Sequence, residues 1–216
     1  MSWFQLDTAS IVQRAGAEGS RANAPSIWES VSRGIVGFTV ISVAGFAPWA
    51  LAGLRLHEAI GEAGLYAVCA IVFIGLSGLL LHRLIIGSGS LGRFYKLFSI
   101  AFGAYAVAWT VGWMSLGGRN GSLLGLLVGT GLMGWMLACA FDARSSAWKV
   151  ITVLFVGNAL GYFGGEWLQG PLASMRTHPT VDKLLWGVCY GMGFGTGLGL
   201  AFYYCQSAAR KILLGR

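Results

Sequence analysis

The most informative segment of the chain lies near its C-terminus and reads GVCYGMGFGTGLG from Gly187 to Gly199. Gly187, Gly191, Gly195 and Gly199 recur every four residues, so they share one face of an α-helix. The segment belongs to an uncharged apolar stretch, 184–206, that is long enough to cross a membrane. Helices in lipid associate through close packing of small residues, because lipid tails leave little hydrophobic force between them. The segment therefore predicts a membrane-spanning helix that its neighbours approach closely.

The composition of the whole chain is typical of a membrane protein. Of its 216 residues, 56% are hydrophobic, 11% are charged and 34 are glycines, whereas about a quarter of the residues in a soluble domain are charged. Apolar windows of about 20 residues, the length that spans a bilayer core, occur at 34–54, 64–84, 97–117, 121–141, 148–168 and 184–206. We predict an all-α polytopic membrane protein with six transmembrane helices packed through rows of glycine and other small residues.

The distribution of positive charge predicts the orientation of these helices. Eleven of the 15 Lys and Arg residues lie in the N-terminal tail, the second and fourth loops and the C-terminal tail. Cytoplasmic segments of membrane proteins carry an excess of these residues. We therefore predict a cytoplasmic tail at 1–33, a six-helix bundle at 34–206 and a second cytoplasmic tail at 207–216. The predicted location is a cytoplasmic (inner) membrane of bacterial type.

The N-terminal tail is predicted to stay on the protein and to lie in the membrane interface. It contains no uninterrupted apolar region of the kind that a cleavable signal peptide needs. Its apolar side chains suit a short amphipathic helix, and they are Trp3, Phe4, Leu6, Ile11 and Val12. Ser26, followed by Glu29, resembles a capping box that begins the first membrane helix.

Two further spans carry the four-residue glycine spacing. The fifth span has Gly157, Gly161 and Gly165, and the fourth has glycines at positions 121, 125 and 129. Such rows allow two helix backbones to approach closely, either within one chain or between chains. Packing within the chain is the favoured interpretation, and a homo-oligomer or a partner membrane subunit is the alternative.

The polar residues of the fifth span form the best candidate site. Asn158, Tyr162 and Glu166 are four residues apart and share one helix face. Polar groups in a membrane usually face the bundle interior or a wet cavity, because hydrocarbon does not solvate them. The functional interpretation is a transport path that opens outward at Glu166, with Thr196 and Tyr203 of the last span as further lining. The alternative is that Asn158 and Tyr162 only bond adjacent helices while water solvates Glu166.

A second group of polar residues is expected outside the membrane. His57, Glu58, Glu62 and His178 have the side-chain types that bind a divalent cation. Their spacing matches no metal motif, so a solvated rim is the favoured interpretation. No cofactor is predicted. A membrane haem needs two axial ligands at one depth, and His82 is expected near the inner side whereas His57 and His178 are expected outside, so only the last two could form such a pair.

Three classes of function remain open. The leading hypothesis is a small transporter or channel-like protein for an ion or small solute. The alternative is a structural or accessory subunit whose glycine rows dock partner helices. A third class is an intramembrane enzyme that uses Glu166 with His57 or His178. Membrane lipids are expected partners, whereas nucleic acid is excluded because the basic residues are not gathered on one folded surface with polar or aromatic readers.

Overall fold

The structure, a computed structural model, describes residues 3–17, 24–174 and 178–215. All regular secondary structure in these ranges is helical, and six helices are long and apolar enough to cross a membrane. The helices are α1 (Thr8–Ala17), α2 (Ile27–Leu81), α3 (Ser90–Leu116), α4 (Gly118–Ala140), α5 (Ala147–Ser174), α6 (Pro179–Cys205) and α7 (Ser207–Leu213), with short 3-10 turns at His82–Leu84 and Arg144–Ser146. The prediction of an all-helical chain with six membrane-length helices is therefore confirmed.

The helix α2 contains the first two spans and folds back on itself. Its backbone leaves helical geometry at Ala52 and at Gly61, where a φ of +71° is readily adopted only by glycine. The first span runs from Ile27 to Gly61, and so begins before the expected residue 34. Its start is set by Ser26, whose hydroxyl accepts a hydrogen bond from the Glu29 amide at 3.1 Å, as the N-cap prediction required.

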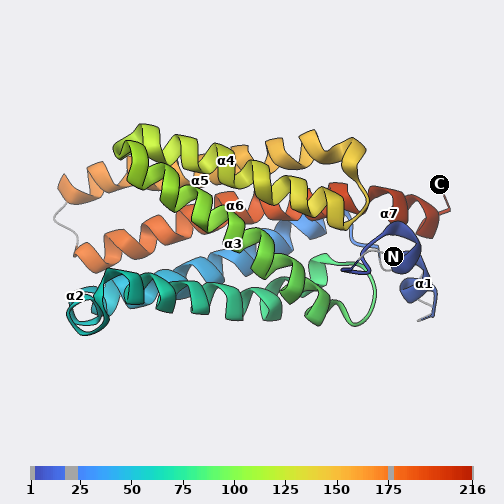
Figure 1. The fold of residues 1–216 in the computed structure, drawn as a ribbon, viewed down its shortest axis with the longest axis horizontal. Helices are drawn as coiled ribbons and strands as arrows, with labels where there is room; N and C mark the ends of the chain where they lie inside the picture. The colour runs from blue at the N-terminus through green and yellow to red at the C-terminus, as the bar shows by residue number, and fades with distance from the viewer. Residues whose placement is uncertain (1–2, 18–23, 175–177, 216) are drawn as a thin grey trace.

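The chain places its two described ends and two of its turns at one end of the bundle. Figure 1 shows α1, α7 and the turns before α3 and α5 on the right, and the turn within α2 and the α3–α4 turn on the left. The first set holds many of the basic residues, among them Arg14, Arg93, Lys96, Lys149 and Lys211. We call this the basic end, and the other the opposite end.

The central helix of the bundle is α6, which packs between α2 and α5. A Cβ atom added to Gly195 would collide with the backbone of Gly34 in α2. On the other side, a Cβ on Gly157 of α5 would lie 2.6 Å from the carbonyl oxygen of Gly193. Real Cβ atoms do not come this close to other atoms. At these two contacts, α6 therefore packs against α2 and against α5 with room only for the glycine hydrogens.

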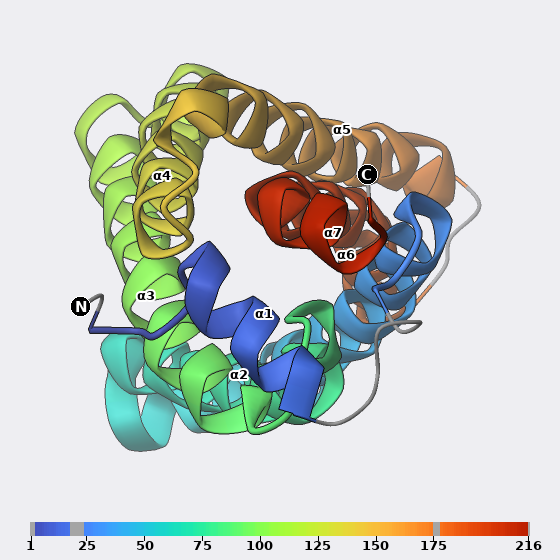
Figure 2. The ribbon, with the colours of Figure 1, turned by 90° about the vertical axis from the view of Figure 1, so that its right-hand side faces the viewer.

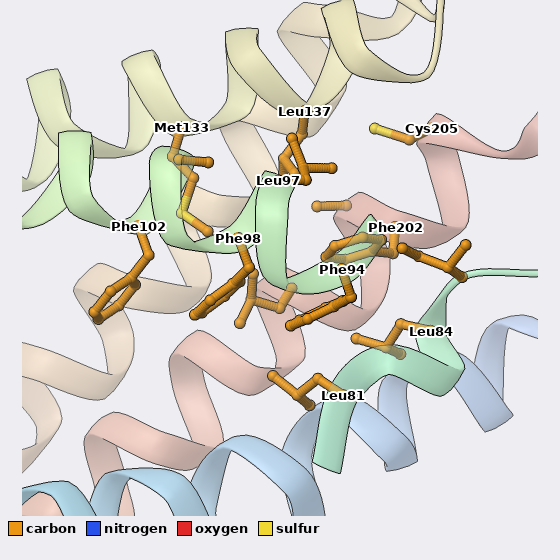
Figure 3. Close-up of a cluster of buried hydrophobic side chains, with 14 of the residues drawn as sticks. Leu81, Leu84, Phe94, Leu97, Phe98, Phe102, Met133, Leu137, Phe202 and Cys205 are labelled. Carbon is orange, nitrogen blue, oxygen red and sulfur yellow. The ribbon is translucent and has the colours of Figure 1, made fainter. Parts of the chain in front are cut away.

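Phenylalanine fills the interior of the bundle toward the basic end. Phe94, Phe98 and Phe102 follow one face of α3, with ring centroids 5.1 Å apart from each ring to the next. Phe202 of α6 stacks on Phe94 at 5.6 Å. These four buried rings, which we call the phenylalanine stack, are enclosed by Leu81, Leu84, Leu97, Met133 and Leu137 (Figure 3). The labelled side chains of this half of the interior are apolar, and the thioether of Met133 and the thiol of Cys205 are their only atoms other than carbon.

Short helices cover the basic end. Figure 2 looks onto this end and shows α1 lying across it beside α7. Leu6 and Ile11 are fully buried, whereas Trp3 keeps 70% of its surface exposed. The apolar face of the predicted amphipathic helix is therefore turned toward the protein.

Polar side chains of the C-terminal segment fasten it to the loops at the basic end. The Gln206 amide nitrogen donates to the Leu84 carbonyl at 2.8 Å, and its oxygen accepts from the Ile86 amide at 2.8 Å. Arg210 donates through Nε to the Pro25 carbonyl at 3.1 Å. These bonds satisfy backbone groups that helix ends leave without partners.

Candidate functional site

The polar stripe of α5 runs from the bundle interior to the surface at the opposite end. Asn158 is fully buried, Tyr162 is half-buried and Glu166 is exposed. The three side chains lie one helical turn apart, because α5 is unbroken through this region. The stripe therefore connects an accessible carboxylate with a buried amide.

Two tyrosines from other helices lie beside Asn158. The hydroxyls of Tyr105 in α3 and Tyr190 in α6 are 3.1 Å apart and both side chains are buried. The Asn158 side chain lies next to the Tyr105 hydroxyl, but neither Oδ1 nor Nδ2 has a hydrogen-bond partner of ordinary geometry within the described part of the chain. An asparagine amide offers two donors and an acceptor. Each such group left unbonded in the interior costs about 1–3 kcal/mol.

Tyr162 extends the polar groups toward the surface. Its hydroxyl is 3.0 Å from the Ser122 hydroxyl of α4 and lies next to the Glu166 carboxylate. Its ring packs edge-on against Trp186 at 5.3 Å and near Trp109 at 6.1 Å. The Trp109 indole nitrogen is buried and, among the residues that the structure describes, has no acceptor.

We call Tyr105, Trp109, Asn158, Tyr162 and Tyr190 the polar cluster. Its members come from α3, α5 and α6, so the packing of three helices is needed to assemble it. The groups that it offers are neutral hydroxyl, amide and indole groups, which bind a ligand by hydrogen bonds rather than by charge. Such groups form hydrogen bonds with water or with the polar part of a small solute.

The phenylalanine stack borders the polar cluster on the side of the basic end. The Phe102 ring lies 5.6 Å from that of Tyr105, and the Phe194 ring lies 5.3 Å from the same tyrosine. Beyond these rings the interior face of α3 carries Phe98 and Phe94. The buried hydroxyls of Ser77 and Thr130 on the neighbouring helices donate to carbonyl groups of their own helices. The polar groups beside Asn158 thus extend toward the opposite end, through Tyr162 and Glu166, and phenylalanine rings follow toward the basic end.

Two residues predicted to line the path lie elsewhere. Thr196 donates to the Met192 carbonyl of its own helix at 2.8 Å, on a face where Met192 is half exposed. Tyr203 lies at the basic end, with the Arg210 guanidinium 3.8 Å from its ring centroid. Glycines occupy the α6 faces toward α2 and α5, and Tyr190 and Phe194 face the interior. Thr196 and Tyr203 therefore take the remaining, outward face.

The structure does not assemble the candidate metal ligands. His57 and Glu58 are exposed on α2, and the side chain of Glu62 lies outside the described residues. His178 uses its Nδ1 to accept from the Thr180 amide at 3.3 Å and so caps the start of α6. A search of the described residues finds no group of three or more metal-ligating side chains.

Four residues around Asn158 and Tyr162 were not in the predicted path: Tyr105, Trp109, Ser122 and Tyr190. A signal for three of them exists in the sequence. Tyr105 and Trp109 are four apart on the third span, and Tyr190 lies at a similar depth on the antiparallel sixth span. Matching residues by depth across antiparallel spans would have selected them, although it could not have shown that they face one another.

Comparisons with known proteins supply no relative for this chain. A scan against protein-family models found no match, and searches of curated proteins and of solved structures also found none. The function is therefore argued from the chain's own geometry.

Proposed function

We propose that this protein is a small transporter or channel-like protein that moves an ion or small solute across a cytoplasmic membrane of bacterial type. Both chain termini lie in the cytoplasm in this proposal, so the opposite end faces outward. The solute enters beside Glu166, passes Tyr162 and binds at the polar cluster. The observation that carries the proposal is Asn158, which is fully buried and whose amide atoms have no hydrogen-bond partner of ordinary geometry within the described residues.

The energetics of Asn158 favour a binding role over a packing role. An apolar residue of similar volume would avoid the penalty of about 1–3 kcal/mol for each unbonded buried group. Hydrogen bonds formed there by a solute are strong, because the surrounding interior has a low dielectric constant. A solute that leaves water can thus recover part of its lost hydration on Asn158 and the tyrosine hydroxyls.

The phenylalanine stack acts as the inner barrier in this proposal. A polar solute at Tyr105 meets Phe102 and Phe194 next, and these rings offer it no hydrogen bonds. Passage therefore requires α3 and α6 to shift relative to each other. Small sliding movements of packed helices are a common form of such change. At the glycine contacts of α6 with α2 and α5, no α6 side chain stands between the helices to oppose sliding.

The proposal is tested by flux measurements on protein reconstituted in liposomes. The probes are Na⁺, K⁺ and H⁺, followed with trapped indicator dyes, and glycerol and urea, followed by light scattering. For whichever probe wild-type protein carries, we expect Asn158→Leu and Glu166→Gln to lower the flux. For Asn158→Leu the reduction is about tenfold, which corresponds to one lost hydrogen bond of ~1.4 kcal/mol.

Thr196→Val is the matched control, because Thr196 is a polar residue of the same bundle that faces away from the polar cluster. It should carry the probe at the wild-type rate. A wild-type flux in Asn158→Leu together with a loss in Thr196→Val would show that the path lies elsewhere. Absence of flux for all five probes would remove them from the proposed substrates and favour a non-transport role.

The accessory-subunit alternative requires a different docking surface from the one expected. Gly191, Gly195 and Gly199 of α6 approach α2, and Gly193 and Gly197 approach α5, all in the same chain. Rows already covered by helices of the chain are not free to receive a partner helix. This occupancy supports transport over docking through α6.

A further inference from the structure

A cavity at the basic end gathers positive charge independently of the polar cluster. It has a volume of about 400 Å³ and lies between the start of α3 and the segment before α1. Its lining consists of Trp3, Phe4, Gln5, Gly89, Gly92, Arg93 and Lys96. Two of these side chains are cationic and none is acidic, so the cavity attracts anions.

The structure holds Arg93 in place at the cavity wall with neutral groups. Its Nη1 donates to the Gly89 carbonyl at 2.6 Å and to the Ser88 carbonyl at 3.3 Å, and its Nη2 donates to the Gln5 side-chain oxygen at 3.4 Å. Lys96 is exposed, and no described residue forms an ion pair with it or with Arg93. Both charges therefore remain uncompensated within the described chain.

A third cation increases the positive potential. Arg14 of α1 lies against the turn at Gly87, and its Nε and Nη2 are buried without a partner in the described ranges. Burial and then the nearby Arg93 charge lower the pKa of Arg14, with only a lesser opposing influence from Asp7. Placing two guanidinium groups near each other is unfavourable unless an anion lies close to them.

The remaining walls suit the rest of a lipid molecule. Trp3 is 70% exposed and its ring packs edge-on against Phe4 at 4.8 Å. Exposed tryptophan at the boundary of apolar helices is typical of the level of lipid headgroups. α3 begins at Ser90, and within the described residues no side chain caps its first turn, so the helix dipole also favours a negative group there.

We infer that this cavity binds the phosphate of an anionic lipid headgroup, with Arg93 and Lys96 as its cationic ligands and Trp3 beside the glycerol backbone. A Cβ atom on Gly92 would meet no atom of the described residues within 4 Å, so the backbone of α3 is open to a close approach there. The site needs no transport activity, and it stands whether or not a solute passes the polar cluster. Free inorganic phosphate shares the same chemistry and is the alternative source of the anion.

Lipid titration by native mass spectrometry tests the inference. Full-length protein is purified in a neutral detergent, stripped of lipid, and titrated with phosphatidylglycerol or with zwitterionic phosphatidylcholine. We expect one tightly bound phosphatidylglycerol, and about fivefold weaker binding of it in Lys96→Gln, since one Lys or Arg near anionic lipid contributes about 1 kcal/mol. Lys211→Gln is the matched control, because Lys211 is an exposed lysine at the same end but does not line the cavity. The affinity of the Lys211→Gln variant for phosphatidylglycerol should equal that of wild-type protein.

Three results would overturn the inference. One is equal affinity of the Lys96→Gln and Lys211→Gln variants for phosphatidylglycerol. Another is equal binding of phosphatidylcholine and phosphatidylglycerol by wild-type protein, which would show that the site does not distinguish an anionic headgroup from a zwitterionic one. The third is full displacement of the lipid by inorganic phosphate, which would assign the site to the free anion. An unchanged unfolding temperature of lipid-free Lys96→Gln verifies that the variant is folded.

Discussion

The two halves of the bundle interior use similar aromatic rings for different purposes. Toward the basic end, Phe94 and Phe98 stack with only carbon atoms in contact. Toward the opposite end, Tyr105 continues the same face of α3, and its hydroxyl lies 3.1 Å from that of Tyr190 in α6. The interior face of α3 thus changes from phenylalanine at Phe102 to tyrosine at Tyr105 within about one turn. In the proposed function, this change from phenylalanine to tyrosine separates the barrier from the binding site.

The largest effect is expected from removing a ring of the phenylalanine stack. Phe98→Ala removes a fully buried ring from the phenylalanine stack, and such truncations lower the free energy of unfolding by about 3–5 kcal/mol. The change is measured by unfolding in detergent, followed by tryptophan fluorescence. Val107→Ala, on an exposed face of the same helix, should change stability by less than about 0.5 kcal/mol. Similar losses in both variants would show that the stack is not the stabilising element.

A smaller change in stability should distinguish glycines of α5 that contact α6 from glycines of α5 that do not. A Cβ on Gly161 of α5 would lie 2.8 Å from the Cys189 carbonyl oxygen of α6, whereas a Cβ on Gly164 would meet no atom of the described residues within 4 Å. Gly161→Ala should therefore lower the free energy of unfolding by about 1–3 kcal/mol. Gly164→Ala should raise it by about 0.5–1 kcal/mol, because alanine favours the helix. Equal changes in stability for Gly161→Ala and Gly164→Ala would mean that α5 and α6 move apart to accept the added methyl group at little cost.

The next substitution removes the buried amide of the polar cluster. Asn158→Leu replaces with hydrocarbon two buried polar atoms that lack a well-formed hydrogen bond within the described residues, so we expect the free energy of unfolding to rise by about 1–2 kcal/mol. Flux of the carried probe should fall in the same variant. A gain in stability with a loss of activity is the expected signature of a residue kept for function. A variant that loses stability would indicate instead that Asn158 is an ordinary packing residue.

Hydropathy was sufficient to predict the spans, because lipid allows only closed hydrogen-bonded segments to cross it. Periodicity also identified Asn158 and Tyr162 as one face of α5. It did not identify Tyr190 as their neighbour, since periodicity shows which residues share a face but not which neighbour that face meets. For α6 it predicted a helix that its neighbours approach closely, and Thr196 was assigned to the path because this glycine-rich helix was expected to lie beside the polar stripe of the fifth span. The structure turns Tyr190 and Phe194 inward instead.

The smallest predicted effect concerns the hydroxyl pair where the two halves meet. Tyr105→Phe and Tyr190→Phe each remove one hydroxyl of the 3.1 Å contact and keep the ring, so each should lower the free energy of unfolding by about 1 kcal/mol. The double variant should lose less than the sum of the single changes, because the second change leaves no unbonded hydroxyl behind. A double-mutant cycle in detergent measures this coupling, which we expect to be about 0.5–1 kcal/mol. Additive losses would mean that each hydroxyl has a separate partner. Asn158, next to Tyr105, would then be the first residue to examine, since its amide could supply that bond and would no longer be free to bind a solute.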